Sequence, residues 1–213
     1  MNSLIKNKKA IVFDWDGTLA NTMEYKRANF VKLMSSFGPS EKDVENFHRE
    51  FSGIPRRKLM QKCLESLAGR DLSEAELEQL SDKYTQMNME SSLSASPFAD
   101  AKMFLEFAKG KFQLFVSSSS DPDELLKVVD NMSLFDCFDE VLGSRPGFGK
   151  GREHIAHIKS KYGYEKEDLI FFGDDKKDYE LNHAAGVETF LLNRNNSSMN
   201  FPTIDSFERL IGG

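Results

Sequence analysis

Short apolar runs alternate with amphipathic stretches over most of the chain. The apolar runs have the length and composition of buried strands and span 10–14, 112–117, 139–142, 168–172 and 187–192. The amphipathic stretches between them predict helices at 100–109, 122–132, 151–162 and 177–185. Strands that alternate with helices are typical of a parallel sheet covered by helices on its faces, so the pattern predicts an α/β fold.

The segment 20–97 has a different pattern, with helical periodicity and no convincing strand. Its start and stop signals predict four helices, which run from Thr22 to Phe37, from about Ser40, from Pro55 to Gly69 and from Ser73. Ser73 and Glu76 form the sequence signature of a capping box. We therefore expect an all-helical domain over residues 20–97, inserted into an α/β core made of residues 1–19 and 98–213.

Composition narrows the classes of protein to consider. A chain of 213 residues is long enough for one core and a small accessory domain. The net charge of -6 and the lack of a basic run argue against a nucleic-acid surface. No stretch approaches the ~20 apolar residues of a membrane span, and the first residues lack the apolar core of a signal peptide. With two cysteines far apart in sequence, we expect a cytoplasmic protein with reduced thiols.

The most informative run is Ile-Val-Phe-Asp-Trp-Asp-Gly-Thr-Leu at 11–19, where a strand leads into two aspartates. Residues i and i+2 of a strand point to the same side, so Asp14 and Asp16 are placed to face one site. Burying paired carboxylates is costly unless they bind a cation or do chemistry. Gly17 permits the tight bend that leaves the sheet. For an isolated Asp-x-Asp, a strand end with two solvated acids would be the simpler interpretation.

Three later motifs also follow predicted strands. Ser117 opens a run of four serines, and its hydroxyl with adjacent N–H groups is suited to a phosphate oxygen. Lys150 lies in a glycine-rich loop, where its ammonium would offset carboxylate repulsion and bind phosphate as a point charge. Asp174 and Asp178 are four residues apart, which puts them on a common side if a helix begins there. Such oxygen ligands suit magnesium.

Together, these four motifs resemble the haloacid dehalogenase-like superfamily, and in particular its phosphoglycolate phosphatase and β-phosphoglucomutase-like branch with a helical cap. The third motif of that family usually reads Lys-Pro, whereas this chain has Lys150-Gly151. The resemblance implies a Rossmann-like core, a helical cap and a Mg²⁺-dependent phosphatase acting on a small phosphorylated metabolite. From the charge and the lack of an apolar span, we expect neither nucleic acid nor a membrane as partner.

The same resemblance assigns roles to individual residues. Asp14 would be the nucleophile and Asp16 the general acid and base. Asp14, the backbone carbonyl of Asp16 and Asp174 would hold the metal, with Asp178 behind them. Ser117, the N–H of Ser118 and Lys150 would hold the transferred phosphoryl group. Asp175 is an additional acid to which the family pattern gives no role.

Residues of the helical segment 20–97 are expected to determine which substrate is bound. Gly53-Ile54-Pro55-Arg56 resembles the cap segment in which a glycine precedes a substrate-facing basic residue. Arg56 is therefore the candidate, because its guanidinium can bind a second phosphate or a carboxylate with two parallel hydrogen bonds. The alternative interpretation is an ordinary basic patch on a solvated helix face.

Other functions compatible with the motifs stay open. A sugar phosphomutase uses the same residues, although mutase-like members tend to carry histidine where this chain has Lys26. A catalytically silent binding module on the same scaffold would normally lose an acid or the lysine, and this chain retains them. A dehalogenase is disfavoured because that branch lacks the second aspartate.

Overall fold

A computed structural model describes residues 2–51, 54–194 and 198–212 of the chain. The chain divides into two compact units, of which one combines Met1–Asn21 with Ala95–Gly213 and the other is Thr22–Ser94. The first unit contains every strand among the described residues, and the second is helical. The α/β class predicted from the alternating pattern is therefore confirmed.

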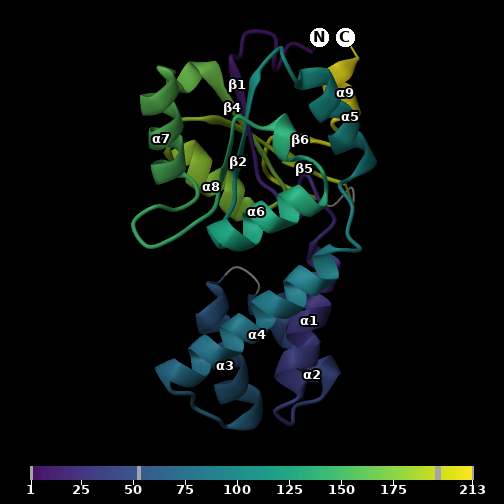
Figure 1. Ribbon diagram of the computed structural model, residues 1–213, viewed down its shortest axis with the longest axis vertical. Helices are drawn as coiled ribbons and strands as arrows, with labels where there is room; N and C mark the ends of the chain where they lie inside the picture. Colours follow the sequence, from purple (N-terminus) through teal and green to yellow (C-terminus); the bar gives the residue numbers. More distant parts are fainter. Residues whose placement is uncertain (1, 52–53, 195–197, 213) are drawn as a thin grey trace. The chain divides into compact units, whose positions relative to one another are not determined.

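The sheet of the first unit is parallel throughout and has the order β3-β2-β1-β4-β5-β6; all of these strands except β3 are labelled in Figure 1. β1 is central, and its four residues are completely buried. A central strand buried on both faces must be apolar throughout, as the sequence Ala-Ile-Val-Phe is. The strands are β1 (Ala10–Phe13), β2 (Gln113–Ser117), β3 (Glu140–Leu142), β4 (Leu169–Gly173), β5 (Glu188–Leu192) and β6 (Thr203–Ile204).

Helices cover both faces of this sheet. Ile11 and Phe13 of β1 pack with α5 (Ala99–Ala108), α6 (Pro122–Asn131) and α9 (Glu208–Ile211). Ala10 and Val12 point the other way, toward the face that carries α7 (Arg152–Tyr162), and α8 (Lys176–Ala184) packs against α7 and β5. Two short 3₁₀ helices, η1 (Phe135–Cys137) and η2 (Lys166–Asp168), complete the unit.

The helical unit has a hydrophobic core of its own. Its helices are α1 (Met23–Ser35), α2 (Glu41–Phe51), α3 (Arg56–Ala68) and α4 (Glu74–Ser92). Each contributes buried apolar side chains to one cluster, which includes Phe30, Val44, Leu64 and Leu80. The capping box predicted at Ser73 and Glu76 is present, and Gly69 ends α3 in the left-handed conformation.

The predicted strands and helices are confirmed, with ends that differ from the observed ones by a few residues. The pattern did not predict β6, α9 or the two 3₁₀ helices, because segments of two to four residues contain at most about one period, which is too short to show a repeating pattern. Of the helices that the structure describes, none has the length and apolar character that crossing a membrane requires.

Candidate active site

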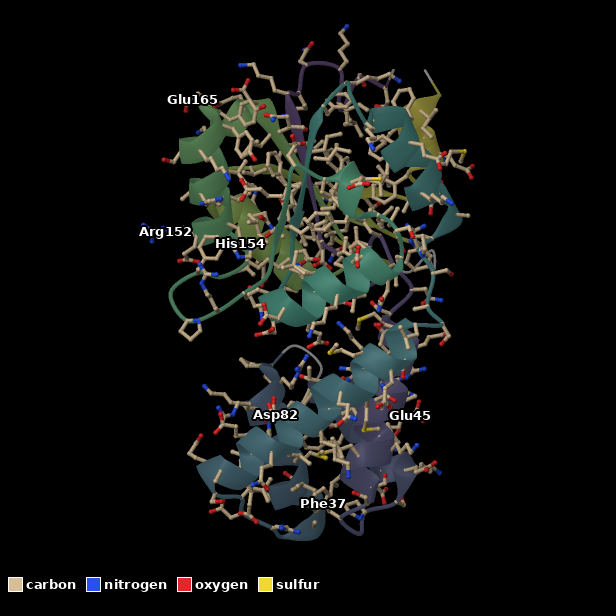
Figure 2. The ribbon with its side chains drawn as sticks, viewed as in Figure 1. Phe37, Glu45, Asp82, Arg152, His154 and Glu165 are labelled. Atoms are coloured by element: carbon tan, nitrogen blue, oxygen red, sulfur yellow. The ribbon has the colours of Figure 1, made fainter. Side chains whose placement is uncertain are left out.

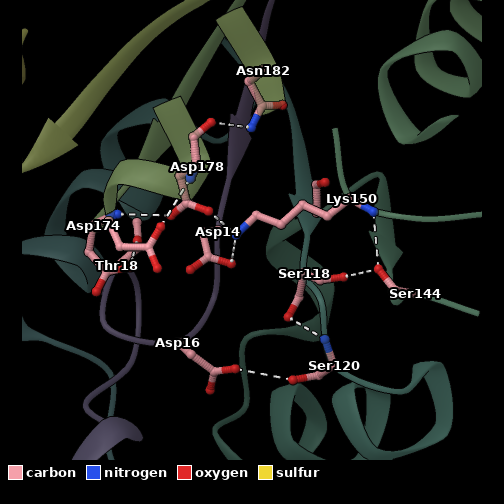
Figure 3. Close-up of polar contacts among 12 residues, drawn as sticks. Asp14, Asp16, Thr18, Ser118, Ser120, Ser144, Lys150, Asp174, Asp178 and Asn182 are labelled. Carbon is pink, nitrogen blue, oxygen red and sulfur yellow. Dashed lines mark hydrogen bonds and ion pairs between the residues drawn. The ribbon is translucent and has the colours of Figure 1, made fainter. Parts of the chain in front are cut away.

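Near the carboxyl ends of β1 and β4, a buried lysine from the loop before α7 lies between two aspartates. Asp14 follows β1, and its backbone N–H donates to the carbonyl of Phe172 on β4 at 2.8 Å. The Nζ of Lys150 lies 2.7 Å from Oδ1 of Asp14 and also contacts Oδ1 of Asp178 (Figure 3). The side chains of Lys150 and Asp14 are each 7% exposed and that of Asp178 is 4% exposed, so all three charges are largely removed from water.

The first turn of α8 fixes the acids that follow β4. Asp175 caps this helix, since its Oδ1 accepts the N–H of Asp178 at 3.0 Å. Oδ2 of Asp178 in turn accepts the N–H of Asp174 at 3.1 Å. The Thr18 hydroxyl, from the loop after β1, donates to Oδ1 of Asp174 at 3.4 Å. Asp175, which the sequence left without a role, therefore orients the segment that carries the other two acids.

This arrangement concentrates negative charge. Oxygens of Asp14, Asp174 and Asp178 lie within 4.8 Å of one another. Burial raises the pKa of Asp14 well above its ordinary value, and the neighbouring carboxylates add to the rise while Lys150 opposes it. Burial and Asp178 raise the pKa of Asp174 to about 7. Burial disfavours the charged form of Lys150, but the carboxylates of Asp14 and Asp178 outweigh it and raise the lysine pKa.

The donor set fits a hard divalent cation. When ionised, three carboxylates and one ammonium leave two net negative charges at the cluster, which one such cation would neutralise. Oxygen ligands of this kind are those that magnesium prefers. Burial is the main cause of the raised pKa values of Asp14 and Asp174, and repulsion between the carboxylates adds to it.

The serine run 117–120 begins with the last residue of β2, and three of its members make distinct contacts. The Ser117 Oγ lies 2.8 Å from Nδ1 of His154, and Ser118 Oγ accepts the N–H of Ser120 at 3.1 Å. Ser120 Oγ donates to Oδ2 of Asp16 at 3.1 Å (Figure 3). The family resemblance assigns the Ser118 N–H to phosphate binding. In the structure, this N–H donates to the carbonyl of Leu142 at 2.9 Å. A role for this N–H in phosphate binding stays a prediction, and it would require the group to leave that carbonyl.

Register places Ser117 beside the nucleophile candidate. Phe13 of β1 pairs with Val116 of β2, so Asp14 and Ser117 are the next residues along these two strands. In a parallel pair, such neighbours project to the same side of the sheet. Asp14, Ser117 and Lys150 are therefore gathered at one edge, whereas the Asp16 carboxylate is held by Ser120.

His154 is a contributor to this region that sequence reasoning missed. It lies near the start of α7 (Figure 2), is fully buried, and has its ring 4.6 Å from that of Phe148. Burial lowers the pKa of His154 to about 4, so the ring is neutral at physiological pH. A histidine in an amphipathic helix gives no signal of its own, and only the fold shows that this one contacts Ser117.

Arg56 belongs to the helical unit, at the start of α3. Its Nη1 donates to Oγ1 of Thr85 at 2.8 Å, and its guanidinium lies 4.9 Å from the ring centre of Tyr84. These contacts tie the side chain to α4 of the same unit. Gly53, the first residue of the motif that singled out Arg56, lies outside the described residues.

Comparisons with known proteins agree with this architecture. A family model described as haloacid dehalogenase-like hydrolase matches residues 11–192, which include both strand-end acidic motifs. A phosphoglycolate phosphatase of Haemophilus influenzae is 25% identical over 185 residues, which are 84% of this chain and 82% of that protein.

Solved structures show the same fold. A protein from Haemophilus somnus, described as a predicted phosphoglycolate phosphatase, superimposes with a TM-score of 0.82 at 18% identity, over 97% of this chain and 98% of its own. The putative hydrolase YfnB from Bacillus subtilis, whose structure was determined bound to magnesium, has a TM-score of 0.75 at 18% identity, over 96% and 97% of the two chains.

Gly17 offers a test of how closely the loop after β1 approaches Asp174. Its φ is +79°, and a Cβ there would lie 2.8 Å from the Asp174 carboxyl carbon. We expect Gly17→Ala to displace Asp174 and weaken Mg²⁺ binding at least tenfold, measured by calorimetry. The matched control is Gly110→Ala, with φ of +78° and open space around the new Cβ. Backbone strain of about 1 kcal/mol is common to both variants, so equal magnesium affinities would contradict the proposed close approach.

Proposed function

This chain belongs to the haloacid dehalogenase-like hydrolase family, and we propose that it is a Mg²⁺-dependent phosphatase that hydrolyses a small phosphomonoester through an aspartyl-phosphate. The observation that carries the proposal is the buried ion pair of Asp14 with Lys150, next to Asp174 and Asp178. A carboxylate at a strand end with a fixed ammonium beside it is suited to attack an anionic phosphoryl group.

The proposed metal ligands are Asp14, the backbone carbonyl of Asp16, Asp174 and Asp178. A bound Mg²⁺ would neutralise charge on the phosphoryl oxygens and on the carboxylates. Asp175 and Thr18 support this assignment, because their hydrogen bonds keep Asp178 and Asp174 in place.

The first proposed step transfers the phosphoryl group to the protein. An Asp14 carboxylate oxygen attacks phosphorus in line, and the bond between phosphorus and the ester oxygen breaks. Asp16 gives its proton to that departing oxygen, which leaves as an alcohol. Lys150 and the Ser117 hydroxyl hold the equatorial oxygens, so that positioning and charge neutralisation lower the barrier.

The second proposed step returns the protein to its starting state. Asp16, now a carboxylate, takes a proton from water as the water oxygen attacks phosphorus. The bond between phosphorus and Asp14 breaks, and inorganic phosphate is released. Asp16 thus ends the cycle protonated and ready for the next ester.

We propose a small phosphorylated metabolite as substrate, because a related protein is a phosphoglycolate phosphatase. The alternative function is a sugar phosphomutase, in which a sugar hydroxyl attacks the aspartyl-phosphate in place of water. A mutase must exclude water until that attack occurs. Lys26 in α1, where mutase-like members tend to have histidine, favours hydrolysis.

Phosphate release with Mg²⁺, measured over a panel of phosphate monoesters, tests this function. We expect the wild-type protein to release phosphate and Asp14→Asn to release none, because an amide is not a nucleophile. Asp16→Asn keeps its backbone carbonyl but loses acid and base catalysis, so kcat should fall by roughly 10²–10⁴-fold.

The products of a hexose 1-phosphate, supplied with a trace of the bisphosphate, separate the two functions. Free phosphate without the 6-phosphate supports hydrolysis, whereas 6-phosphate formed many times faster than free phosphate would establish the mutase. Near-normal turnover by Asp14→Asn would show that the nucleophile is misassigned.

The raised pKa of Asp174 predicts a pH dependence of metal binding. A carboxyl with a pKa of about 7 in the metal-free protein holds a proton below that pH and must release it to bind Mg²⁺. Affinity should therefore fall as pH falls through 7, by about tenfold between pH 8 and pH 6 for one proton. Calorimetry in buffers of different ionisation enthalpy would count the protons released. An affinity independent of pH, with no proton release, would contradict the prediction.

Substrate choice is predicted to depend on Arg56. If its guanidinium binds a second anionic group, Arg56→Ala should lower kcat/KM for such substrates by roughly 10- to 150-fold, equivalent to about 1.5–3 kcal/mol. An aryl phosphate without that group should be hardly affected. The neighbouring Arg57, which pairs with Glu74, gives the control variant Arg57→Ala. Equal losses on both substrates would instead show that the contacts of Arg56 with Thr85 and Tyr84 support the cap.

A further inference from the structure

The loop after β2 brings a hydroxyl to the Asp16 carboxylate. Ser120 Oγ donates to Oδ2 of Asp16 at 3.1 Å, across 104 positions of the sequence. Asp16 follows β1 and Ser120 follows β2, which are adjacent parallel strands, so the contact joins two neighbouring strand ends. We propose that Ser120 is a positioning residue that holds Asp16 in the orientation required for proton transfer. The inference rests on the proposed function of Asp16.

The backbone around Ser120 is fixed on both sides. Its N–H donates to Ser118 Oγ at 3.1 Å, and its carbonyl accepts the N–H of Ser144 at 2.8 Å. Ser144 Oγ donates to the carbonyl of Ser118 at 2.8 Å, which closes the network between the segments after β2 and β3. Because the backbone of Ser120 is already held in place, its hydroxyl loses little conformational entropy when it binds Asp16.

Close packing adds to this rigidity. A Cβ on Gly143 would lie 2.9 Å from the carbonyl oxygen of Ser120 and 2.5 Å from Cα of Pro122. Pro122 begins α6, which Asp121 caps by accepting the N–H groups of Asp123 and Glu124. The segment that carries Ser120 is thus confined between the glycine and the helix start.

The Ser120 hydroxyl can form a hydrogen bond with Asp16 both when Asp16 carries a proton and when it does not. When Asp16 is a carboxylate, the Ser120 O–H can donate to it; when Asp16 carries the proton, the same oxygen can accept. The hydrogen bond can therefore persist through both proposed steps whichever Asp16 oxygen carries the proton, whereas an N–H group could not accept from the Asp16 O–H. Losing the hydrogen bond would remove one restraint on the Asp16 rotamer and so slow proton transfer without removing the acid.

The test compares kcat/KM for two esters, since this parameter reports the step in which the ester bond breaks. An alkyl phosphate needs a proton on its leaving oxygen, whereas p-nitrophenyl phosphate leaves as a stable anion. We expect Ser120→Ala to lower kcat/KM by about tenfold for the alkyl ester and by about twofold at most for the aryl ester. Ser120→Thr, which keeps the hydroxyl, should restore the alkyl activity.

Two further variants exclude a merely structural effect. Ser119→Ala changes the adjacent exposed serine and should leave both activities and the melting temperature unchanged. In an Asp16→Asn background, Ser120→Ala should cause no further loss on the alkyl ester. Equal losses on both esters, or a further tenfold loss in that background, would overturn the role of Ser120.

The proposed function fails in a different way. If Asp16→Asn alone turned over the alkyl ester normally, general acid catalysis by Asp16 would be refuted, and the role of Ser120 with it. If Asp16→Asn is impaired and Ser120→Ala is not, the function stands and only the inference about Ser120 is wrong.

Discussion

The buried ammonium of Lys150 is the group around which the site is organised. Asp14 and Asp178 are each almost completely removed from water, and a buried charge without a partner is strongly destabilising. Lys150 contacts both, and its loop lies between β3 and α7. The positions of β1, β3 and β4 in one parallel sheet are what bring these three charges together. The sheet order is thus a condition for the chemistry as well as for the core.

A second ion pair, between Arg194 and Asp100, also holds the loop after β1. Arg194, which follows β5, binds both carboxylate oxygens of Asp100 at 2.8 Å, and its Nη2 donates to the carbonyl of Thr18 at 2.9 Å. Asp100 also accepts the N–H of Phe207. Thr18 is therefore fixed by its carbonyl on one side, while its hydroxyl reaches Asp174 on the other. The loop that carries Asp16 is thus anchored to Arg194 after β5 and to Asp174 after β4, in addition to Ser120 after β2.

The sequence predicts the strand ends well, because each carries two independent signals. At Asp14 and at Asp174, an uninterrupted apolar run identifies a buried strand. The acids that follow the run are the second signal, because charged side chains are normally solvated and these are placed at the end of a buried strand. Parallel strands bring their carboxyl ends to one edge. These two facts are enough to gather Asp14, Asp174 and Asp178 before any coordinates are known.

Other contacts depend on register and side-chain direction, which the pattern does not encode. The hydrogen bond of Ser120 with Asp16 requires β1 and β2 to be adjacent and in a given register. His154 has the same helical spacing as core residues of α7, so periodicity cannot distinguish it from them. The capping role of Asp175 could have been predicted from the sequence, because an acid three residues before Asp178 at a strand-to-helix junction is an N-cap signal.

The charge balance of the site explains why hydroxyl groups, rather than further charged groups, contact the acids at this edge of the sheet. Asp14, Asp16, Asp174 and Asp178 already exceed the positive charge of Lys150, so a further acid would raise the pKa of Asp14 and of Asp174 still more. Hydroxyl groups supply hydrogen bonds without altering that balance. The polar contacts around the acids are accordingly made by the hydroxyls of Ser120 and Thr18 and by backbone N–H groups. Neutral donors orient the carboxylates, and Lys150 supplies the compensating positive charge among these groups.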